Sequence, residues 1–341
     1  MQDEHPPALP RKGAPPQWLV QARTHAWEYV VRFVQNPGVL QVIAAFDARY
    51  AHIADPNERL DYLAKLAAAE WDFRKGRERF EITETYPMDA PDSALGRTIF
   101  EGARQAEMAS GSTATLRHYS ILAILGGANK SPYTRLRYGL EQHITYDMLA
   151  YLGSERALQP PEQAQVQGYA PGARTEFDLG KGAITTLLHG ELSSGGEYDL
   201  CTSEWHIVRL QTKRQVPIFL LSAPPFLGGT RANTADTYDF LRRLEQEAFS
   251  PAKNILFVTA AMYRYAQYFD AVREISLRTG VDIETIGYDP AYSGVQFKPT
   301  QFLQELKAAV DAAVRLRDAI HGQEELHAWR TQHYKRFERE G

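Results

Sequence analysis

The sequence predicts an α/β fold: a mostly parallel sheet with helices on both faces, preceded by a helical N-terminal region. Strand-like and helical segments alternate through about 200 residues after residue 113, and right-handed crossovers then give a parallel sheet. The strand-like segments are unbroken apolar runs, such as Ile121–Leu125, which suit strands buried on both faces. Gly126 and Gly127 end that run, and a helical pattern begins near Pro132, as at the ligand edge of open α/β sheets.

Length and composition suit a globular protein with one large or two ordinary domains. The chain has 341 residues, of which 44% are hydrophobic and 23% charged. We expect a disordered Pro-rich tail (1–16), a helical N-terminal region (17–113), the α/β domain (114–322) and a charged C-terminal tail (323–341).

Charge and cysteine usage exclude several classes of function. The net charge of −4 gives no basic field for nucleic acid or anionic lipid. No stretch approaches the roughly 20 apolar residues of a membrane helix, and the first residues lack the apolar core of a secretory signal. The single cysteine, Cys201, excludes an internal disulfide, is a poor nucleophile candidate and fits a cytoplasmic protein.

The N-terminal region has helical periodicity. Apolar residues recur at helical spacing in Trp18–Phe33, Leu60–Trp71 and Ser93–Met108. The proline-containing stretch Glu81–Asp92 is expected to connect two of these helices. Because the aromatic residues share this spacing, they are expected to form core rather than a binding surface, and Gly111–Thr113 marks the boundary.

The α/β part is expected to contain further strands and helices in alternation. The expected strands after the first are Asp147–Leu152, Trp205–Leu210, Val216–Ser222, Ile255–Thr259 and Val281–Ile286. The expected helices start at Thr175, Asn233, Tyr263 and Thr300. The proline-rich stretch Gln159–Arg174 is expected to be a loop.

The first candidate binding segment follows the first strand. Free backbone N–H groups and a helix start attract anions there. Its candidate ligand-binding residues are Gly126, Gly127, Asn129, Lys130, Ser131 and Arg135. Neither a full Gly-x-Gly-x-x-Gly nor a Walker sequence is present, so a standard dinucleotide or P-loop site is not predicted. The alternative is a tight turn with solvated basic side chains.

Two acidic residues at a strand-to-helix junction are the candidate acid/base residues. Glu176 and Asp178 open the helix that follows Thr175. The alternative role is capping, in which Thr175 is the N-cap and Asp178 its capping-box partner.

Polar residues also follow the other strands, and the carboxyl ends of parallel strands meet at one edge. These candidates are Asn233 as a catalytic residue and Glu155, Thr230, Thr259, Tyr263 and Arg264 as ligand-binding residues. Thr230 and Asn233 could equally cap a helix, and Arg264 could bind a carboxylate or phosphate or be solvated. The ten histidines show no metal-binding spacing, so no metal is predicted.

The pattern resembles the YdcF/SanA/ElyC-like family of bacterial α/β proteins. The first strand with its glycine pair and Arg135-Leu136 is similar to the opening motif of that family, and Glu176 to its glutamate after the second strand. Thr230-Arg231-Ala232-Asn233 resembles its Thr-Arg-Glu-Asn motif, and Val258-Thr259 the end of its next strand. The resemblance runs from about Ile121 to Ile286 and implies a Rossmann-like three-layer αβα sandwich with a pocket at the strand ends.

The chain also departs from that family. Ala232 replaces a glutamate, Tyr263 stands where a histidine is usual, and Ala266 where an arginine is usual. The membrane anchor of many relatives is not found. The resemblance implies little about the reaction, since most of the family lacks an assigned activity.

These observations favour a cytoplasmic enzyme, a transferase or hydrolase, that acts on a small polar or anionic, nucleotide-like metabolite in a specialised biosynthetic pathway. S-adenosylmethionine is one candidate ligand, because Rossmann-like sheets often hold an adenosine group at this edge. The alternatives are a metabolite- or partner-binding protein without catalysis, and a structural subunit of a larger complex. The sequence leaves the oligomeric state open, a homo-oligomer included.

Overall fold

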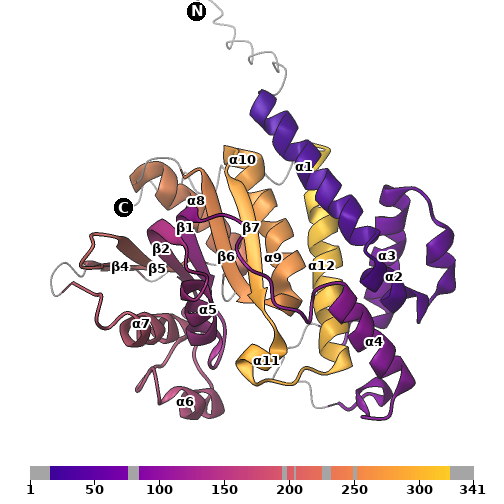
Figure 1. Cartoon of the computed structure of the whole chain (residues 1–341), viewed down its shortest axis with the longest axis horizontal. Coiled ribbons are helices and arrows are strands. Elements are labelled where there is room, and N and C mark those ends of the chain that lie inside the picture. The colour runs from indigo at the N-terminus through magenta and orange to yellow at the C-terminus, as the bar shows by residue number, and fades with distance from the viewer. Residues whose placement is uncertain are drawn as a thin grey trace, which may run out of the picture.

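The strands of the chain form one sheet in the order β3-β4-β5-β2-β1-β6-β7 in the computed structural model (Figure 1). The structure describes residues 16–75, 84–193, 198–202, 205–224, 232–248 and 252–322. The strands are β1 (His118–Leu125), β2 (Thr145–Gly153), β3 (Tyr198–Cys201), β4 (His206–Gln211), β5 (Pro217–Ser222), β6 (Asn254–Ala260) and β7 (Asp282–Tyr288).

Five neighbouring strands, from β5 to β7 in the sheet order, run parallel. Strands β4 and β3 extend the β5 edge in antiparallel pairing. The chain passes from the central strand β1 to β2 and β5 on one side, and then returns to β6 and β7 on the other. The strand order therefore reverses between β1 and β6, where open α/β sheets bind their ligands.

Helices cover both faces of the sheet. The helices are α1 (Gln17–Val34), α2 (Pro37–Ala44), α3 (Pro56–Glu70), α4 (Ala94–Gln105), α5 (Ser131–Leu140), α6 (Pro160–Val166), α7 (Glu176–Leu187), α8 (Thr234–Ala248), α9 (Arg264–Ala271), α10 (Leu277–Thr279), α11 (Pro290–Ser293) and α12 (Pro299–Ile320). Residues of α5, α6 and α7 share a core with one face of the sheet, and residues of α8 and α9 share a core with the other. The predicted α/β class with a mostly parallel sheet is confirmed.

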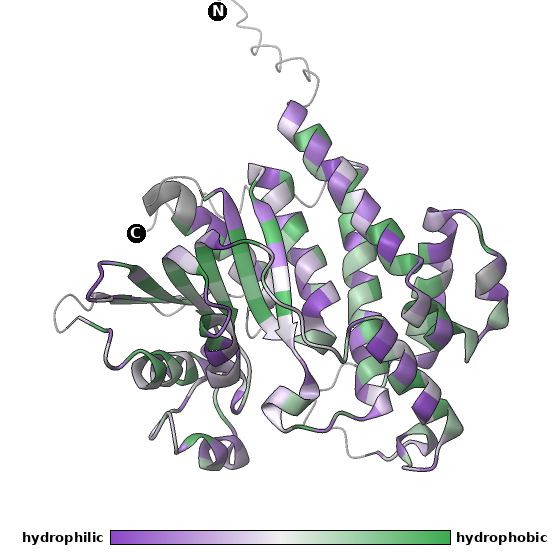
Figure 2. Cartoon of the chain, in the orientation of Figure 1, coloured by the Kyte–Doolittle hydropathy of each residue, from purple (hydrophilic) through white to green (hydrophobic). Residues whose placement is uncertain are grey.

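The apolar run of β1 supplies both cores. Leu122 and Ile124 point to the core under α5 and α7, whereas Ile121 and Ala123 point to the core under α8. Successive side chains of a strand point to opposite faces, so a strand covered on both sides needs an apolar residue at every position. Figure 2 shows this as continuous hydrophobic colour along the central strands.

The N-terminal helices form a further layer outside α9. Helix α12 lies between α9 and the helices α3 and α4 (Figure 1). Buried side chains such as Phe33 of α1, Phe269 of α9 and Leu306 of α12 belong to one core. The division of the chain at residue 113 stays a prediction. Within the described residues, no helix is both long and apolar enough to cross a membrane.

One expected element needs correction, and one strand was not expected. The stretch Gln159–Arg174, expected to be a loop, contains helix α6, because Pro160 and Pro161 stand at its first positions, where proline is favourable. The Glu162 carboxylate accepts the Gln159 N–H at 2.7 Å and caps this helix. A further strand, β3, pairs with β4 at the sheet edge. The expected disordered tails, 1–16 and 323–341, lie almost wholly outside the described residues.

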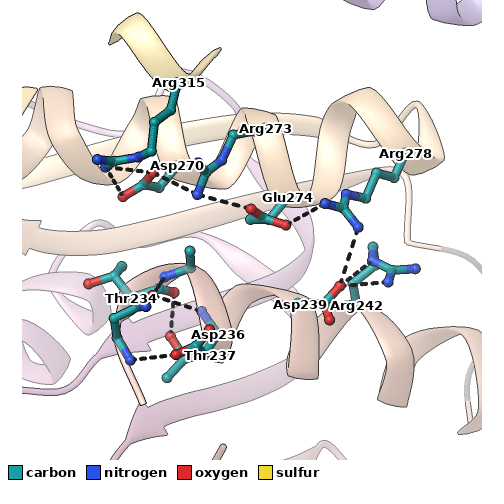
Figure 3. A network of polar contacts seen from close by, with 12 residues as sticks. Thr234, Asp236, Thr237, Asp239, Arg242, Asp270, Arg273, Glu274, Arg278 and Arg315 are labelled. Atoms are coloured by element: carbon teal, nitrogen blue, oxygen red, sulfur yellow. Dashed lines mark hydrogen bonds and ion pairs between the residues drawn. The ribbon is translucent and has the colours of Figure 1, made fainter. Parts of the chain in front are cut away.

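A network of ion pairs connects α8 to the helices beside it (Figure 3). Asp239 of α8 contacts Arg242 at 2.6 Å and Arg278 at 3.7 Å. Arg278 also contacts Glu274 at 2.8 Å, and Glu274 contacts Arg273 at 2.9 Å. Glu274 is fully buried in a π-helical turn, Val272–Ser276, that follows α9. Because α8 begins at the carboxyl edge of the sheet, these contacts also fix the helix that borders the cavity described below.

Asp239→Asn is expected to reduce the pH dependence of stability in acid. Burial raises the pKa of the Asp239 carboxyl, but the charges and hydrogen bonds of Arg242 and Arg243 outweigh it, so the pKa lies below its ordinary value of 3.8. A lowered pKa in the folded state contributes stability that is present above the ordinary value and is lost as the pH falls through the lowered one. Urea unfolding of both proteins from pH 7 to pH 2.5 measures this. Equal slopes in acid would contradict the role of Asp239.

Candidate functional site

A polar cavity lies at the carboxyl ends of β1 and β2, next to the point where the strand order reverses. Its volume is about 330 Å³, which is within the range of small-molecule sites. It is lined by Leu125, Gly126, Gly127, Leu152, Gly153, Ser154, Glu176, Ala232, Asn233, Thr234, Thr237 and Gln267. The lining therefore comes from the ends of two strands, the starts of α7 and α8, and helix α9.

The glycine pair after β1 shapes one wall of the cavity. The Gly126 N–H donates to the Leu152 carbonyl at 2.6 Å, and a Cβ at Gly126 would lie 2.6 Å from that same oxygen. Only glycine allows so close an approach of two strand ends. A Cβ at Gly127 would lie 3.2 Å from Ser131 Cβ and 3.3 Å from Arg135 Nη1. The glycines thus keep the turn close to β2 and leave room in front of the Arg135 guanidinium.

Arg135 of α5 is a buried cation behind this turn. Its side chain is 4% exposed, and its Nη1 donates to the carbonyls of Leu125, at 2.9 Å, and Gly126. Its guanidinium also lies 5.7 Å from the centre of the Tyr263 ring. Arg135 forms no ion pair with a described residue, and its buried Nε has no hydrogen-bond partner among them. A buried charge without a counter-ion is costly, and the described residues at this edge of the sheet do not neutralise the charge of Arg135.

Glu176 is the charged residue among the described residues of the lining. Its two carboxylate oxygens accept hydrogen bonds from Ser154 Oγ at 2.6 Å and from Arg156 Nε at 2.8 Å. Arg156 is held in turn by both carboxylate oxygens of Glu162, at 2.9 and 3.0 Å. Each carboxylate oxygen has a second lone pair, so Glu176 can still accept hydrogen bonds from a ligand, in an orientation fixed by the protein.

Asp178 lies two residues beyond Glu176 but caps the helix. Its carboxylate accepts the backbone N–H groups of Arg174 at 2.8 Å and Thr175 at 3.0 Å. Thr175 Oγ1 accepts the Asp178 N–H at 3.2 Å in return, which completes a capping box. These contacts favour the capping alternative, and Asp178 is not part of the cavity lining.

Asp178→Ala is expected to destabilise the protein by about 0.5–2 kcal/mol, the usual cost of losing an N-cap interaction. Ligand binding in the cavity should change little. Chemical denaturation gives the first value and a thermal-shift titration the second. A loss of binding without a loss of stability would return Asp178 to the candidate acid/base residues.

Asn233 lines the cavity and also caps the start of α8. Its Oδ1 accepts the backbone N–H groups of Ala235 at 2.8 Å and Asp236 at 3.1 Å, and Asp236 accepts the Asn233 N–H at 2.8 Å. Thr234 and Thr237, which also line the cavity, lie beside Asp236 at the start of α8 (Figure 3). The amide oxygen of Asn233 is committed to the helix, which leaves its amide nitrogen for a ligand.

Other predicted residues lie away from the cavity lining. The guanidinium of Arg264 contacts Glu107 at 2.5 Å, which ties α9 to the segment after α4. Glu155 contacts His206 of β4 at 2.9 Å, and Lys130 is exposed. Thr230 lies outside the described residues.

Three further predicted residues lie close to this edge of the sheet but do not line the cavity. Thr259, at the end of β6, is fully buried and its Oγ1 has no described partner. Asn129 has a positive φ of 53°, a buried Oδ1 without a described partner, and a carbonyl that accepts the Tyr169 hydroxyl at 2.6 Å. Ser131 lies beside Gly127 at the start of α5.

Several lining or supporting residues were not among the predicted ones. Ser154 and Arg156 follow β2 directly and hold Glu176, so the strand-end argument that selected Glu155 could have found them. Gln267 of α9 and Thr237 of α8 reach the cavity from within helices, and the local sequence gives no signal for either. The buried Oε1 of Gln267 has no described partner. In the described part of the chain, no group of three His, Cys, Asp or Glu residues could hold a metal ion.

Comparisons with known proteins give relatives without an assigned role. A family model described as "Rv3785 N-terminal domain" matches residues 20–99. The chain is similar to "Uncharacterized protein Mb3814" of Mycobacterium bovis and to "Uncharacterized protein Rv3785" of Mycobacterium tuberculosis. Each is 26% identical over 324 residues, which cover 85% of this chain and 89% of the relative. No solved structure matches.

Proposed function

We propose that this protein is an enzyme that binds a small polar, anionic metabolite in the cavity at the ends of β1 and β2 and acts on it as a transferase or hydrolase. The observation that carries the proposal is the buried guanidinium of Arg135, which forms no ion pair with a described residue, behind the wall of a cavity that Glu176 lines. A preformed pocket at the carboxyl ends of the strands, lined by a few converging polar groups, is the usual ligand-binding site of an α/β sheet.

The residues take separate roles in this proposal. Arg135 attracts an anionic group of the ligand to the turn at Gly127, and Asn233 and Thr234 orient it from the start of α8. Glu176 accepts a hydrogen bond from the ligand, either as the acid/base residue or as an anchor. Nucleotide-like compounds, S-adenosylmethionine among them, are the first to test, because Rossmann-like sheets often hold an adenosine group at this edge. The single cysteine supports a cytoplasmic site of action.

One observation favours a second candidate function, a non-catalytic metabolite sensor. Both carboxylate oxygens of Glu176 and the amide oxygen of Asn233 already accept hydrogen bonds within the protein. Groups fixed in this way suit recognition as well as they suit proton transfer.

Turnover separates the two functions. Purified protein is incubated with S-adenosylmethionine, AMP and ATP, and binding is followed by thermal shift while the compounds are followed by mass spectrometry. An enzyme binds one of these compounds and converts it to a product. Binding and conversion both decrease in Glu176→Gln but not in Glu70→Gln, which removes an exposed carboxylate of α3. A compound that binds and returns unchanged supports the sensor. Unchanged binding and turnover in both Glu176→Gln and Asn233→Ala, with folding intact, would contradict the site.

A further inference from the structure

One positive and one negative charge lie beside the cavity, and the described residues do not fully neutralise either of them. Arg135 contributes one positive charge and forms no described ion pair. On the other side, Arg156 is shared between the carboxylates of Glu176 and Glu162, so these three residues together carry a net charge of −1. The protein thus holds a cation and an anion next to one cavity without pairing them to each other.

The two charges lie near the same buried side chain. Burial raises the pKa of the Tyr151 hydroxyl well above its ordinary value; Glu176 raises it further and Arg135 lowers it. The hydroxyl donates to the Glu176 carbonyl at 2.9 Å. Both charges therefore act on the same hydroxyl of β2.

Glu176 is open to the cavity, whereas Arg135 is 4% exposed and lies behind the cavity wall. On the Arg135 side the wall is Gly127, where a Cβ would lie 3.3 Å from the guanidinium nitrogen Nη1. The Oε1 of Gln267 adds a second acceptor to the lining; it is buried and, unlike the Glu176 oxygens, has no described partner. An ammonium group has three N–H donors, and a carboxylate with an amide oxygen satisfies two of them.

We propose that the ligand is a zwitterion of the α-amino acid type, free or attached to a nucleoside, and this rests on the proposed function. Its carboxylate lies towards Arg135 and Gly127, and its ammonium group lies between Glu176 and Gln267. The cavity, at about 330 Å³, is near the lower end of the range for small-molecule sites, which suits a ligand of this size. Each end of such a ligand neutralises a charge that the described residues leave uncompensated, and a molecule with one charge neutralises only one.

Matched compounds test the two charges separately. The thermal unfolding of the full chain is measured with each of the twenty L-amino acids, with the amine that each gives on loss of its carboxyl group, and with the acid that each gives on loss of its amino group. S-adenosylmethionine is compared with 5′-methylthioadenosine, which has the same nucleoside without the amino acid. We expect at least one zwitterion to raise the unfolding temperature, and its amine, acid or nucleoside counterpart to bind at least tenfold more weakly.

Two variants locate the binding. Glu176→Gln removes the negative end and Gly127→Ala crowds the approach to Arg135, and each is expected to weaken the zwitterion at least tenfold, whereas the surface variant Glu70→Gln has no effect. Equal binding of the zwitterion and a singly charged counterpart, or unchanged affinity in Glu176→Gln, would overturn the proposal. If AMP or inorganic phosphate binds in the cavity and no zwitterion does, the zwitterion is wrong and the proposed function stands. If none of these compounds binds, both fail.

Discussion

Glu176→Gln is expected to weaken ligand binding by about ten- to a hundredfold. Hydrogen bonds to a charged group contribute about 1.5–3 kcal/mol, and each 1.4 kcal/mol changes affinity tenfold. The carboxylate is already held by Ser154 and Arg156, so little conformational entropy has to be lost when a ligand binds. Calorimetric titration with S-adenosylmethionine, or with a compound released from the purified protein, measures the change.

The control for this prediction is Glu70→Gln, at an exposed position of α3. Circular dichroism and urea unfolding of all three proteins establish that each variant is folded. Glu176→Gln with wild-type affinity and a wild-type fold would remove Glu176 from the site.

Gly38→Ala is expected to destabilise the protein by about 1–3 kcal/mol or more, the usual cost of overpacking a core. Helices α2 and α4 meet at Gly38 and Gly102 with their backbones in contact. A Cβ at Gly38 would lie 2.2 Å from the Gly102 carbonyl oxygen and 2.3 Å from the Ala106 nitrogen. Backbone atoms cannot move aside as the end of a flexible side chain can, so the helices must separate and lose contacts.

Gly190→Ala is the matched control, because a Cβ there would meet no atom within 4 Å. Chemical denaturation of the three proteins gives the free energies of unfolding. A Gly38→Ala protein as stable as Gly190→Ala would contradict the close packing of α2 and α4. Ligand binding at the sheet edge is expected to survive in Gly38→Ala while the protein is folded.

The fold could be predicted for those elements whose burial determines the pattern of their apolar residues. The run Ile121–Leu125 indicates a strand covered on both faces, and both cores use it. Helix α6 was not predicted because prolines 160 and 161 were interpreted as loop residues, although proline both ends and starts helices. Strand β3 is exposed at all four positions, so no hydrophobic pattern marks it.

The site was predictable at the starts and ends of elements. Gly126, Gly127, Glu176 and Asn233 stand at such positions, and the parallel sheet brings them to one cavity. Contacts between side chains from distant parts of the chain could not be predicted, because they leave no signal in the local sequence. The Arg264 side chain meets Glu107, 157 positions away in the sequence, and a guanidinium at a helix start looks the same in sequence whether it binds an anion or a neighbouring carboxylate.

The small molecules that the purified protein retains show whether the cavity at the ends of β1 and β2 binds a metabolite. Wild-type protein and Glu176→Gln are purified in parallel and denatured, and the released compounds are identified by mass spectrometry. We expect wild-type protein to release a small polar metabolite in an amount comparable to that of the protein, and Glu176→Gln to release much less of it. A compound that both proteins release in equal amounts would bind elsewhere, and this would contradict the assignment of the cavity at the ends of β1 and β2.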